Sequence, residues 1–207
     1  MCNFKVVPDT NKGFKMTQYS SLNRIVEVKN QSKNGATFMK SIFCLLLLFF
    51  TLFSYGQKKT SFNVNDSAKD FVVQMVNGEK IKLSELKGKV VLLNFWATWC
   101  GSCLVEFHAF PSKIVEPYKN SAFVLLPIST GETMEKVKDK MAQLKKDGID
   151  FNVSIDPDRS IFNQYAKPGV PRNFLIDKKG IIRYISIGYN EEKLNNISSM
   201  INKLLDE

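Results

Sequence analysis

Cys100 and Cys103 are the residues of this chain whose types and spacing most directly indicate chemistry. Two cysteines three residues apart fit on the first turn of one helix, where free N–H groups and the helix dipole stabilise a thiolate on the first cysteine. The preceding run, Val90–Trp96, is apolar apart from one asparagine and predicts a buried strand. A strand, a short turn and a helix that opens with Cys-x-x-Cys together indicate electron exchange between dithiols and disulfides.

The N-terminal quarter of the chain contains an apolar run, Ile42–Phe53, that is shorter than the roughly 20 residues of a bilayer-spanning helix. Met39-Lys40 precedes the run and small residues follow it, so residues 39–56 are predicted to be a secretory signal peptide. Its cleavage is expected near Gly56, and an uncleaved membrane anchor is the alternative. Cys44 is not at the end of the run, where a lipidated N-terminus would need it.

The boundaries of the remaining segments follow from this prediction. Because a signal peptide begins near its own Met, we expect translation to start at Met39 and residues 1–38 to be a mis-assigned upstream leader or disordered. Residues 57–67 are polar and expected to be loose, and residues 68–207 are expected to form one domain.

The cysteine count sharpens the redox interpretation. The chain has four cysteines, and Cys2 and Cys44 lie in the part that we expect to be removed. An exported protein with only Cys100 and Cys103 has no disulfide framework and is predicted to carry a redox pair. Half of a zinc site is the alternative, but zinc normally needs four ligands and the sequence offers no second cysteine pair or histidine cluster.

The formal net charge of +9 is unevenly distributed. Residues 1–56 hold seven basic and two acidic residues, and the rest of the chain holds 22 basic and 18 acidic ones. Within residues 135–140 lysines alternate with acids, a pattern typical of a solvated helix face. We therefore expect no nucleic-acid binding.

Hydrophobic patterning predicts strands and helices that alternate through the middle of the chain, with a hairpin toward each end. Asn77-Gly78 lies between two β-rich runs and marks the first hairpin. The other predicted elements are a hairpin at 173–187, strands at 122–128 and 151–155, and helices at 100–118, 132–146, 159–166 and 191–205. The first of these helices is expected to bend or break near Pro111. This order predicts an α/β domain with a mixed sheet and helices on both faces.

Two segments carry a resemblance to a known family. Asn94–Cys103 together with Glu106, and Gly169–Asp177 with its Val-Pro-x-x-Phe-Leu-Ile-Asp pattern, resemble the thioredoxin superfamily and most of all its exported TlpA/ResA type. The resemblance covers roughly residues 62–207. It implies a thioredoxin fold with an N-terminal β-hairpin and a TlpA-type insertion of one strand and one helix, acting as a thiol-disulfide oxidoreductase with no cofactor and no metal.

The resemblance also implies roles for the residues around the cysteines. Cys100 would be the exposed nucleophile that forms a mixed disulfide with a substrate, and Cys103 would then attack it to release the reduced substrate. Glu106 shares a helix face with Cys103 and would exchange a proton with its thiol. A solvent-facing acid is the alternative for Glu106.

Substrate binding is expected beside the cysteines. Pro171 would be in cis, so that Val170 offers its N–H and C=O to an extended substrate strand, and an ordinary trans proline is the alternative. Trp99 is expected to flank the pair and shape the docking surface, whereas Trp96 is expected in the core.

The sequence departs from the family pattern at two positions, Ser102 and His108, and it differs from thioredoxin itself at Asn94. Ser102 replaces a common proline between the cysteines, which leaves the direction of electron transfer open. His108 stands where many relatives have a helix-kinking proline, and we expect a surface histidine there. Asn94 stands where thioredoxin has a strand aspartate, so it cannot serve as that acid.

Relatives of this type mostly reduce disulfides in extracytoplasmic proteins, often apocytochrome cysteines, with electrons from a membrane partner. The resemblance therefore implies a periplasmic, monomeric reductase of disulfide-containing client proteins that is supplied by a membrane-bound donor. Three rival functions share the fold, namely a copper-binding chaperone, a peroxidase and a module that holds substrates without turnover. The first needs Cys-x-x-x-Cys with a distant histidine and the second needs Pro-x-x-x-Thr-x-x-Cys, and the sequence has neither.

Overall fold

The computed structural model describes residues 61–207. The expected leader at 1–38 and the expected signal peptide at 39–56 lie outside the described residues, as do residues 57–60 of the segment 57–67. Within the described part, no helix is long and apolar enough to cross a membrane.

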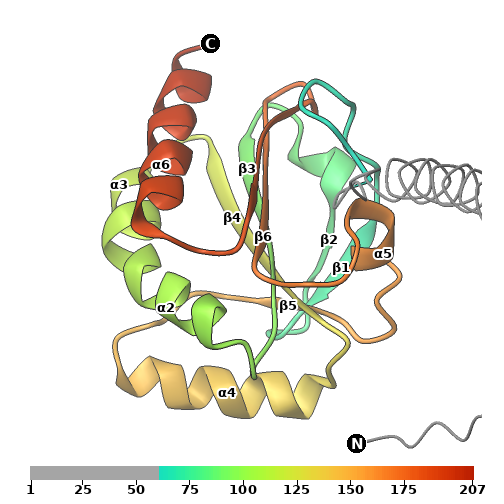
Figure 1. Ribbon diagram of the computed structural model, residues 1–207, viewed down its shortest axis with the longest axis vertical. Coiled ribbons are helices and arrows are strands. Elements are labelled where there is room, and N and C mark those ends of the chain that lie inside the picture. Colours follow the sequence, from blue (N-terminus) through green and yellow to red (C-terminus); the bar gives the residue numbers. More distant parts are fainter. Residues whose placement is uncertain (1–60) are drawn as a thin grey trace, which may run out of the picture. The chain divides into compact units, whose positions relative to one another are not determined.

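The described elements follow the predicted order (Figure 1). The strands are β1 (Val72–Met75), β2 (Lys80–Lys82), β3 (Val90–Trp96), β4 (Phe123–Thr130), β5 (Ser154–Asp156), β6 (Arg172–Ile176) and β7 (Ile182–Ile187). The helices are α2 (Gly101–Phe110), α3 (Glu116–Tyr118), α4 (Met134–Lys146), α5 (Phe162–Tyr165) and α6 (Glu191–Asp206), with a 3₁₀ turn at Leu83–Leu86 and a π-helical segment at Pro111–Val115.

The strands form one mixed sheet in the order β2-β1-β5-β4-β3-β6-β7. β3 pairs in parallel with β4 and antiparallel with β6, and β4 pairs in parallel with β5. The two predicted hairpins are present as β1–β2 and β6–β7. Helix α4 and strand β5 lie between β4 and β6, where the resemblance implies an extra helix and strand. The α/β prediction is thus confirmed.

Every residue of β3 is buried, because helices and loops cover both faces of the sheet at this strand. Successive side chains of a strand point to opposite faces. Val90, Leu92 and Trp96 accordingly belong to one core with α2, α4 and α6, and Val91, Leu93 and Phe95 belong to a second core with α5. Figure 1 shows α2, α3 and α6 on one side of the sheet and α5 on the other. Asn94 therefore faces the α2 side.

Helix α2 packs against that face through a stripe of residues spaced three and four apart. The buried positions of the stripe are Cys103, Glu106, Phe107 and Phe110. This spacing places side chains on one face of a helix. A carboxyl group therefore stands within an otherwise apolar stripe, one turn from the second cysteine.

One local prediction is wrong. The strand predicted at 151–155 begins only at Ser154, and Phe151 instead packs its ring against Phe107 at 5.0 Å between centroids. The bend or break predicted near Pro111 agrees with the structure, because the regular α-helix ends at Phe110. The chain continues as a π-helical segment in which the N–H of Glu116 donates to the carbonyl of Pro111.

Candidate active site

Cys100 and Cys103 form a disulfide at the N-terminus of α2, with their Cα atoms 5.2 Å apart. Cys100 is the N-cap residue of the helix, and its Sγ accepts a hydrogen bond from the N–H of Cys103 at 3.2 Å. The expectation of an exposed Cys100 is wrong for this state, because the residue is only 6% exposed. Cys103 is fully buried, so Cys100 is still the more accessible of the two.

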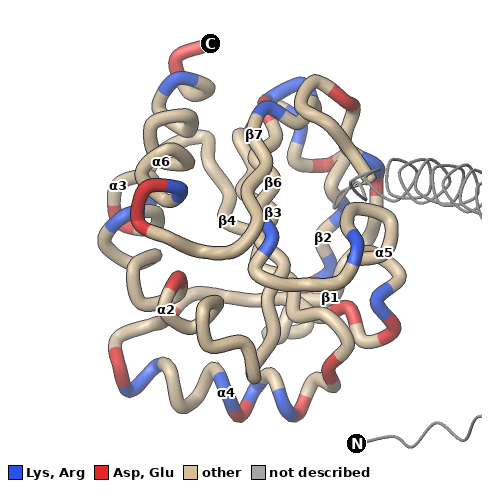
Figure 2. Tube along the Cα trace, in the orientation of Figure 1, with Lys and Arg blue, Asp and Glu red and all other residues tan. Residues whose placement is uncertain are grey.

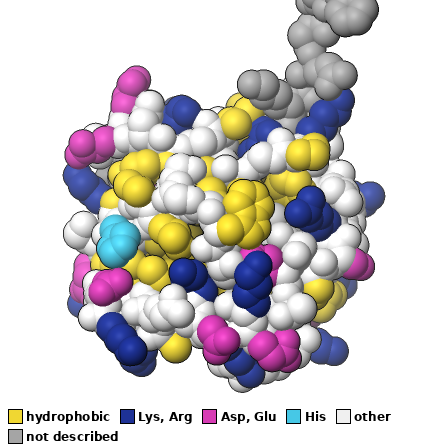
Figure 3. Space-filling view, turned by 60° about the horizontal axis from the view of Figure 1, so that its bottom comes forward, with side chains coloured by type: hydrophobic (Ala, Val, Ile, Leu, Met, Phe, Trp, Pro, Cys, Tyr) yellow, Lys and Arg dark blue, Asp and Glu magenta, His cyan; other side chains and the backbone are white. Residues whose placement is uncertain are grey.

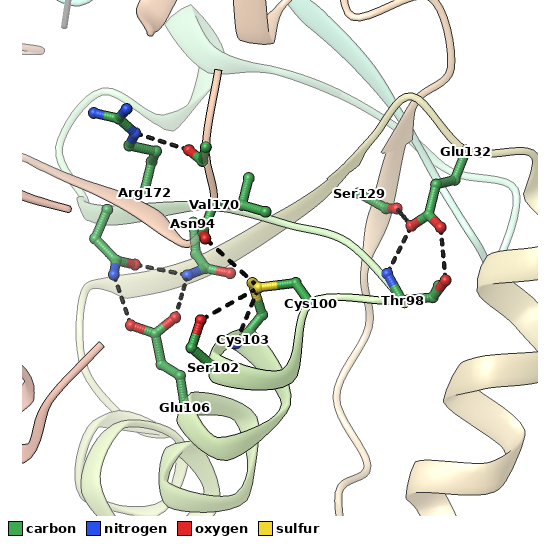
Figure 4. The surroundings of a disulfide bond; sticks show 12 residues. Asn94, Thr98, Cys100, Ser102, Cys103, Glu106, Ser129, Glu132, Val170 and Arg172 are labelled. Carbon is green, nitrogen blue, oxygen red and sulfur yellow. Dashed lines mark hydrogen bonds between the residues drawn. A yellow bond between two sulfur atoms is a disulfide. The ribbon is translucent and has the colours of Figure 1, made fainter. Parts of the chain in front are cut away.

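Two neighbours cover the sulfur of Cys100. Its Sγ lies 3.6 Å from the carbonyl oxygen of Val170 and 3.5 Å from the hydroxyl of Ser102 (Figure 4). The serine that departs from the family pattern thus places a hydroxyl group beside the reactive sulfur. Such a donor stabilises a thiolate in the same way as the N–H of Cys103 does.

The loop before β6 brings the second sequence motif to the cysteines. The Val170–Pro171 peptide is cis, which confirms the expected geometry. Val170 is half-buried, and its N–H donates no hydrogen bond to any described residue. The carbonyl of Pro171 accepts from the N–H of Gly188 at 2.9 Å. Among the described residues nothing accepts from the Val170 N–H, so Val170 presents a backbone edge with a free donor beside the disulfide.

Glu106 is buried, with 2% of its surface exposed, so the alternative of a solvent-facing acid is excluded. Its two carboxyl oxygens accept hydrogen bonds from Asn94 Nδ2 at 2.9 Å and from Asn173 Nδ2 at 2.7 Å. Burial raises the pKa of Glu106 from its ordinary 4.5 to about 7, against the opposing effect of the two amide donors. This carboxyl group can therefore gain and lose a proton at neutral pH.

Asn94 lies between this carboxyl group and the disulfide. Its Nδ2 also donates to Asn173 Oδ1 at 2.7 Å, so the amide has one fixed orientation. Its Oδ1 is buried and has no hydrogen-bond partner. In Figure 4 this oxygen points toward the disulfide. A reduced Cys103 would bring a thiol donor to the same place.

Glu132 is a second buried carboxylate, located just after β4, and the sequence analysis did not single it out. Its oxygens accept from the N–H and the hydroxyl of Thr98, at 2.7 and 2.6 Å, and from the hydroxyl of Ser129 at 2.8 Å. Lys136 Nζ forms an ion pair with it at 3.0 Å. These contacts fix the turn that carries Trp99 into the helix.

The pKa of Glu132 moves in the opposite direction to that of Glu106. Burial by itself would raise it, but the hydrogen bonds from Thr98, Ser129 and Lys136 outweigh burial and hold the pKa below its ordinary value. Glu132 therefore stays ionised at neutral pH and is unsuited to proton transfer.

The surface around the disulfide is apolar and surrounded by charges. Trp99 is 64% exposed and Val105 is 55% exposed, whereas Trp96 is fully buried as expected. Figure 3 shows apolar side chains gathered on this face, with the chain's single histidine, the exposed His108, at their margin. Figure 2 shows charges of both signs along α4, and residues 135, 136, 138 and 139 are exposed, which confirms the predicted solvated helix face.

The structure brings all six predicted site residues to one end of the sheet, and it adds residues that the sequence analysis missed. These are Asn173 and Glu132, polar residues within or next to otherwise apolar strands, and that pattern was a usable signal. In the described part of the chain, no group of three or more His, Cys, Asp or Glu side chains is placed to hold a metal ion.

The comparisons with known proteins agree with this geometry. The model of the AhpC/TSA family matches residues 64–185. The thiol-disulfide oxidoreductase ResA of Bacillus subtilis (strain 168) is 31% identical over 144 residues, which cover 69% of this chain and 78% of that protein.

Two solved structures are similar to the whole described domain. A provisionally assigned protein disulfide isomerase from Bacteroides thetaiotaomicron is 35% identical with a TM-score of 0.67, covering 72% of this chain and 94% of that one. A Chlorobium tepidum protein provisionally assigned as the thiol:disulfide interchange protein DsbE is 27% identical with a TM-score of 0.60, covering 69% and 98%. These similarities confirm the thioredoxin fold.

Proposed function

Because this chain belongs to the AhpC/TSA family and is a thiol-disulfide oxidoreductase of the ResA type, we propose that it reduces disulfides in extracytoplasmic proteins. The observation that carries the proposal is the position of the Cys100–Cys103 disulfide, between the free backbone edge of Val170 and a buried Glu106 whose pKa is about 7. The Val170 side of the disulfide can bind a polypeptide, and the Glu106 side can accept and donate a proton.

The first step is attack by Cys100. In the reduced protein its thiolate is stabilised by the N–H of Cys103, by the helix dipole and by the Ser102 hydroxyl. The thiolate attacks one sulfur of the client disulfide, a mixed disulfide forms, and the other client sulfur leaves with the bonding electron pair.

The second step is attack by Cys103, which needs its thiol proton removed. Ionised Glu106, one helical turn away, takes that proton, and Asn94 and Asn173 hold the carboxylate in position. The Cys103 thiolate then attacks Cys100 Sγ in the mixed disulfide, and the client sulfur leaves as a thiolate with the bonding electron pair. The client has gained two electrons, and its two thiolates take up one proton from Glu106 and one from solvent. A dithiol donor restores the reduced enzyme.

Docking of the client involves the exposed Trp99 and the Val170–Pro171 loop. An extended client segment adds to the free backbone edge of Val170, while the indole covers the apolar residues that flank the client cysteine. No cofactor is needed, because both electrons are carried by the cysteines.

The cellular setting is part of the same proposal. The protein is exported by the signal peptide at 39–56, acts as a monomer in the periplasm, and receives electrons from a membrane-bound donor. Apocytochrome cysteines before haem attachment are the proposed client class. Sequencing the N-terminus of the exported protein tests the location, and a mature chain that retains Ile42–Phe53 would contradict cleavage.

Insulin reduction with dithiothreitol as the donor tests the activity. We expect turnover by the native protein, none by Cys100→Ser, and a trapped mixed disulfide between insulin and Cys103→Ser. Failure of the native protein to exceed the uncatalysed rate would contradict the proposal. A reduction potential near −120 mV, the oxidising end of the known range, would instead indicate an oxidase.

A further inference from the structure

Arg172 is a buried cation next to the substrate-binding loop. It follows Pro171 directly, opens β6, and is only 2% exposed. Its side chain turns back over the loop that precedes it, and in Figure 4 the guanidinium points away from the disulfide while Val170 lies beside the sulfur. The charge is therefore not part of the reacting centre.

The guanidinium binds the backbone of that loop. Its Nε donates to the carbonyl of Gly169 at 2.9 Å, and its Nη2 donates to the carbonyls of Lys167 and Pro168 at 3.2 and 3.3 Å. Three consecutive carbonyls thus point at one cation. The carbonyl of Val170 is the next in the chain, and it points instead to Cys100 Sγ at 3.6 Å.

Burying this cation has a cost that the loop must offset. Burial lowers the pKa of Arg172 from its ordinary value, which reflects the lost hydration of the guanidinium. A guanidinium stays protonated in proteins and holds its donors in a rigid plane. If one of the three carbonyls turned away, the desolvated guanidinium would lose a hydrogen bond. The guanidinium therefore holds the three carbonyls together.

We propose that Arg172 is a positioning residue, which holds residues 167–171 so that the backbone edge of Val170 is presented to a polypeptide substrate beside Cys100. The inference rests on the proposed function. The inference also predicts a difference between substrates, because only substrates whose backbone pairs with the loop depend on Arg172. A small disulfide reaches Cys100 without a docked strand and does not depend on it.

Kinetics with two substrates test this role. In Arg172→Met, which keeps a long apolar stem without donors, we expect the KM for insulin to rise about tenfold with kcat within twofold. The rate with 5,5′-dithiobis(2-nitrobenzoic acid) should change less than twofold. Arg172→Lys keeps the charge without the planar donors, and we expect it to fall between Arg172→Met and the native protein.

The matched control is Arg183→Met, which removes a guanidinium that pairs with Asp177 and Glu207. We expect it to leave both substrates unaffected. Equal losses with insulin and with the small disulfide in Arg172→Lys, or no change in KM for insulin in either Arg172 variant, would overturn the proposal.

Hydrogen exchange separates this inference from the proposed function. In the oxidised protein, the amide of Gly188, which donates to the carbonyl of Pro171 in this loop, should exchange faster in Arg172→Lys than in the native protein or in Arg183→Met. This readout needs no catalysis, so it holds even if the native protein fails to reduce insulin. Unchanged exchange at the Gly188 amide would overturn the positioning role itself.

Discussion

Glu106 and Glu132 are two buried glutamates on either side of the Cys100–Cys103 disulfide (Figure 4), and their carboxyl groups respond to burial in opposite ways. Burial raises the pKa of Glu106 to about 7, whereas hydrogen bonding holds the pKa of Glu132 below its ordinary value against the effect of burial. The two residues are 2% and 5% exposed, but the carboxyl group of Glu106 lies deeper among protein atoms, so desolvation raises its pKa more.

The hydrogen-bond donors add to this difference. Glu106 accepts from two neutral side-chain amides, and Glu132 accepts from a backbone N–H, two hydroxyls and an ammonium group. Hydrogen bonds that involve a cation or converge on an anion offset desolvation far better than isolated neutral ones. The same residue type is thus suited to proton transfer at one position and to anchoring a turn at the other.

The largest expected effect concerns folding stability around Glu106. The pKa of Glu106 is higher in the folded protein than in the unfolded chain, so the protonated carboxyl group favours the folded state. This contribution to the free energy of unfolding is complete below the unfolded pKa and is lost as pH rises through about 7. Compared with Glu106→Gln, the oxidised native protein should lose about 3 kcal/mol between pH 4.5 and 8, measured by urea unfolding. Glu116→Gln, an exposed site, should show no such loss. A pH-independent difference between Glu106→Gln and the native protein would contradict the raised pKa.

The next effect is on the rate of disulfide exchange. Because ionised Glu106 takes the proton of Cys103, the native rate of insulin reduction should rise as pH passes about 7. Glu106→Gln should be about 100-fold slower at pH 7.5 and should lack that transition. Stopped-flow kinetics from pH 5.5 to 8.5 would measure both. A variant with the native rate–pH curve would show that Glu106 is only part of the scaffold.

A smaller effect is expected at Glu132, with the opposite dependence on pH. Its folded pKa is depressed, so its stabilisation is present above the ordinary glutamate pKa and is lost as pH falls through the folded value. Glu132→Gln should lower the free energy of unfolding by about 2 kcal/mol at pH 7, and the difference should shrink toward pH 3. Glu116→Gln, at an exposed position, is the control. If the difference in free energy of unfolding between Glu132→Gln and the native protein grew on acidification, the lowered pKa of Glu132 would be contradicted.

The smallest effect is expected from the ion pair on Glu132. Lys136 is 57% exposed, so solvent screens its interaction with the carboxylate. Lys136→Met should reduce the free energy of unfolding by about 0.5 kcal/mol, and 1 M salt should reduce the difference further. A loss as large as that of Glu132→Gln would mean that the cation, and not the three neutral donors, keeps Glu132 ionised.

Local patterns predicted most of the fold. The apolar run at β3, the Asn77-Gly78 turn and the stripe of α6 each depend on residues close in sequence, and each element was placed within a few residues. The error at Phe151 arose because its apolar character was assigned to a strand, whereas its ring packs against α2. The proline predicted the interruption of the α-helix near Pro111, whereas the π-helical form of the next turn depends on what packs around it.

The sequence by itself determined the chemistry: the Cys-x-x-Cys spacing at a helix start, the proline that follows Val170, and a glutamate one turn after Cys103. Only the tertiary structure decided how each polar group behaves there. The pKa of Glu106 depends on a hydrogen bond from Asn173, which is 67 residues away, and the pKa of Glu132 depends on hydrogen bonds from Thr98. The orientation of Val170 depends on the Arg172 guanidinium, which turns back over the preceding loop. Desolvation and hydrogen bonding are properties of a three-dimensional neighbourhood, and no local pattern specifies that neighbourhood.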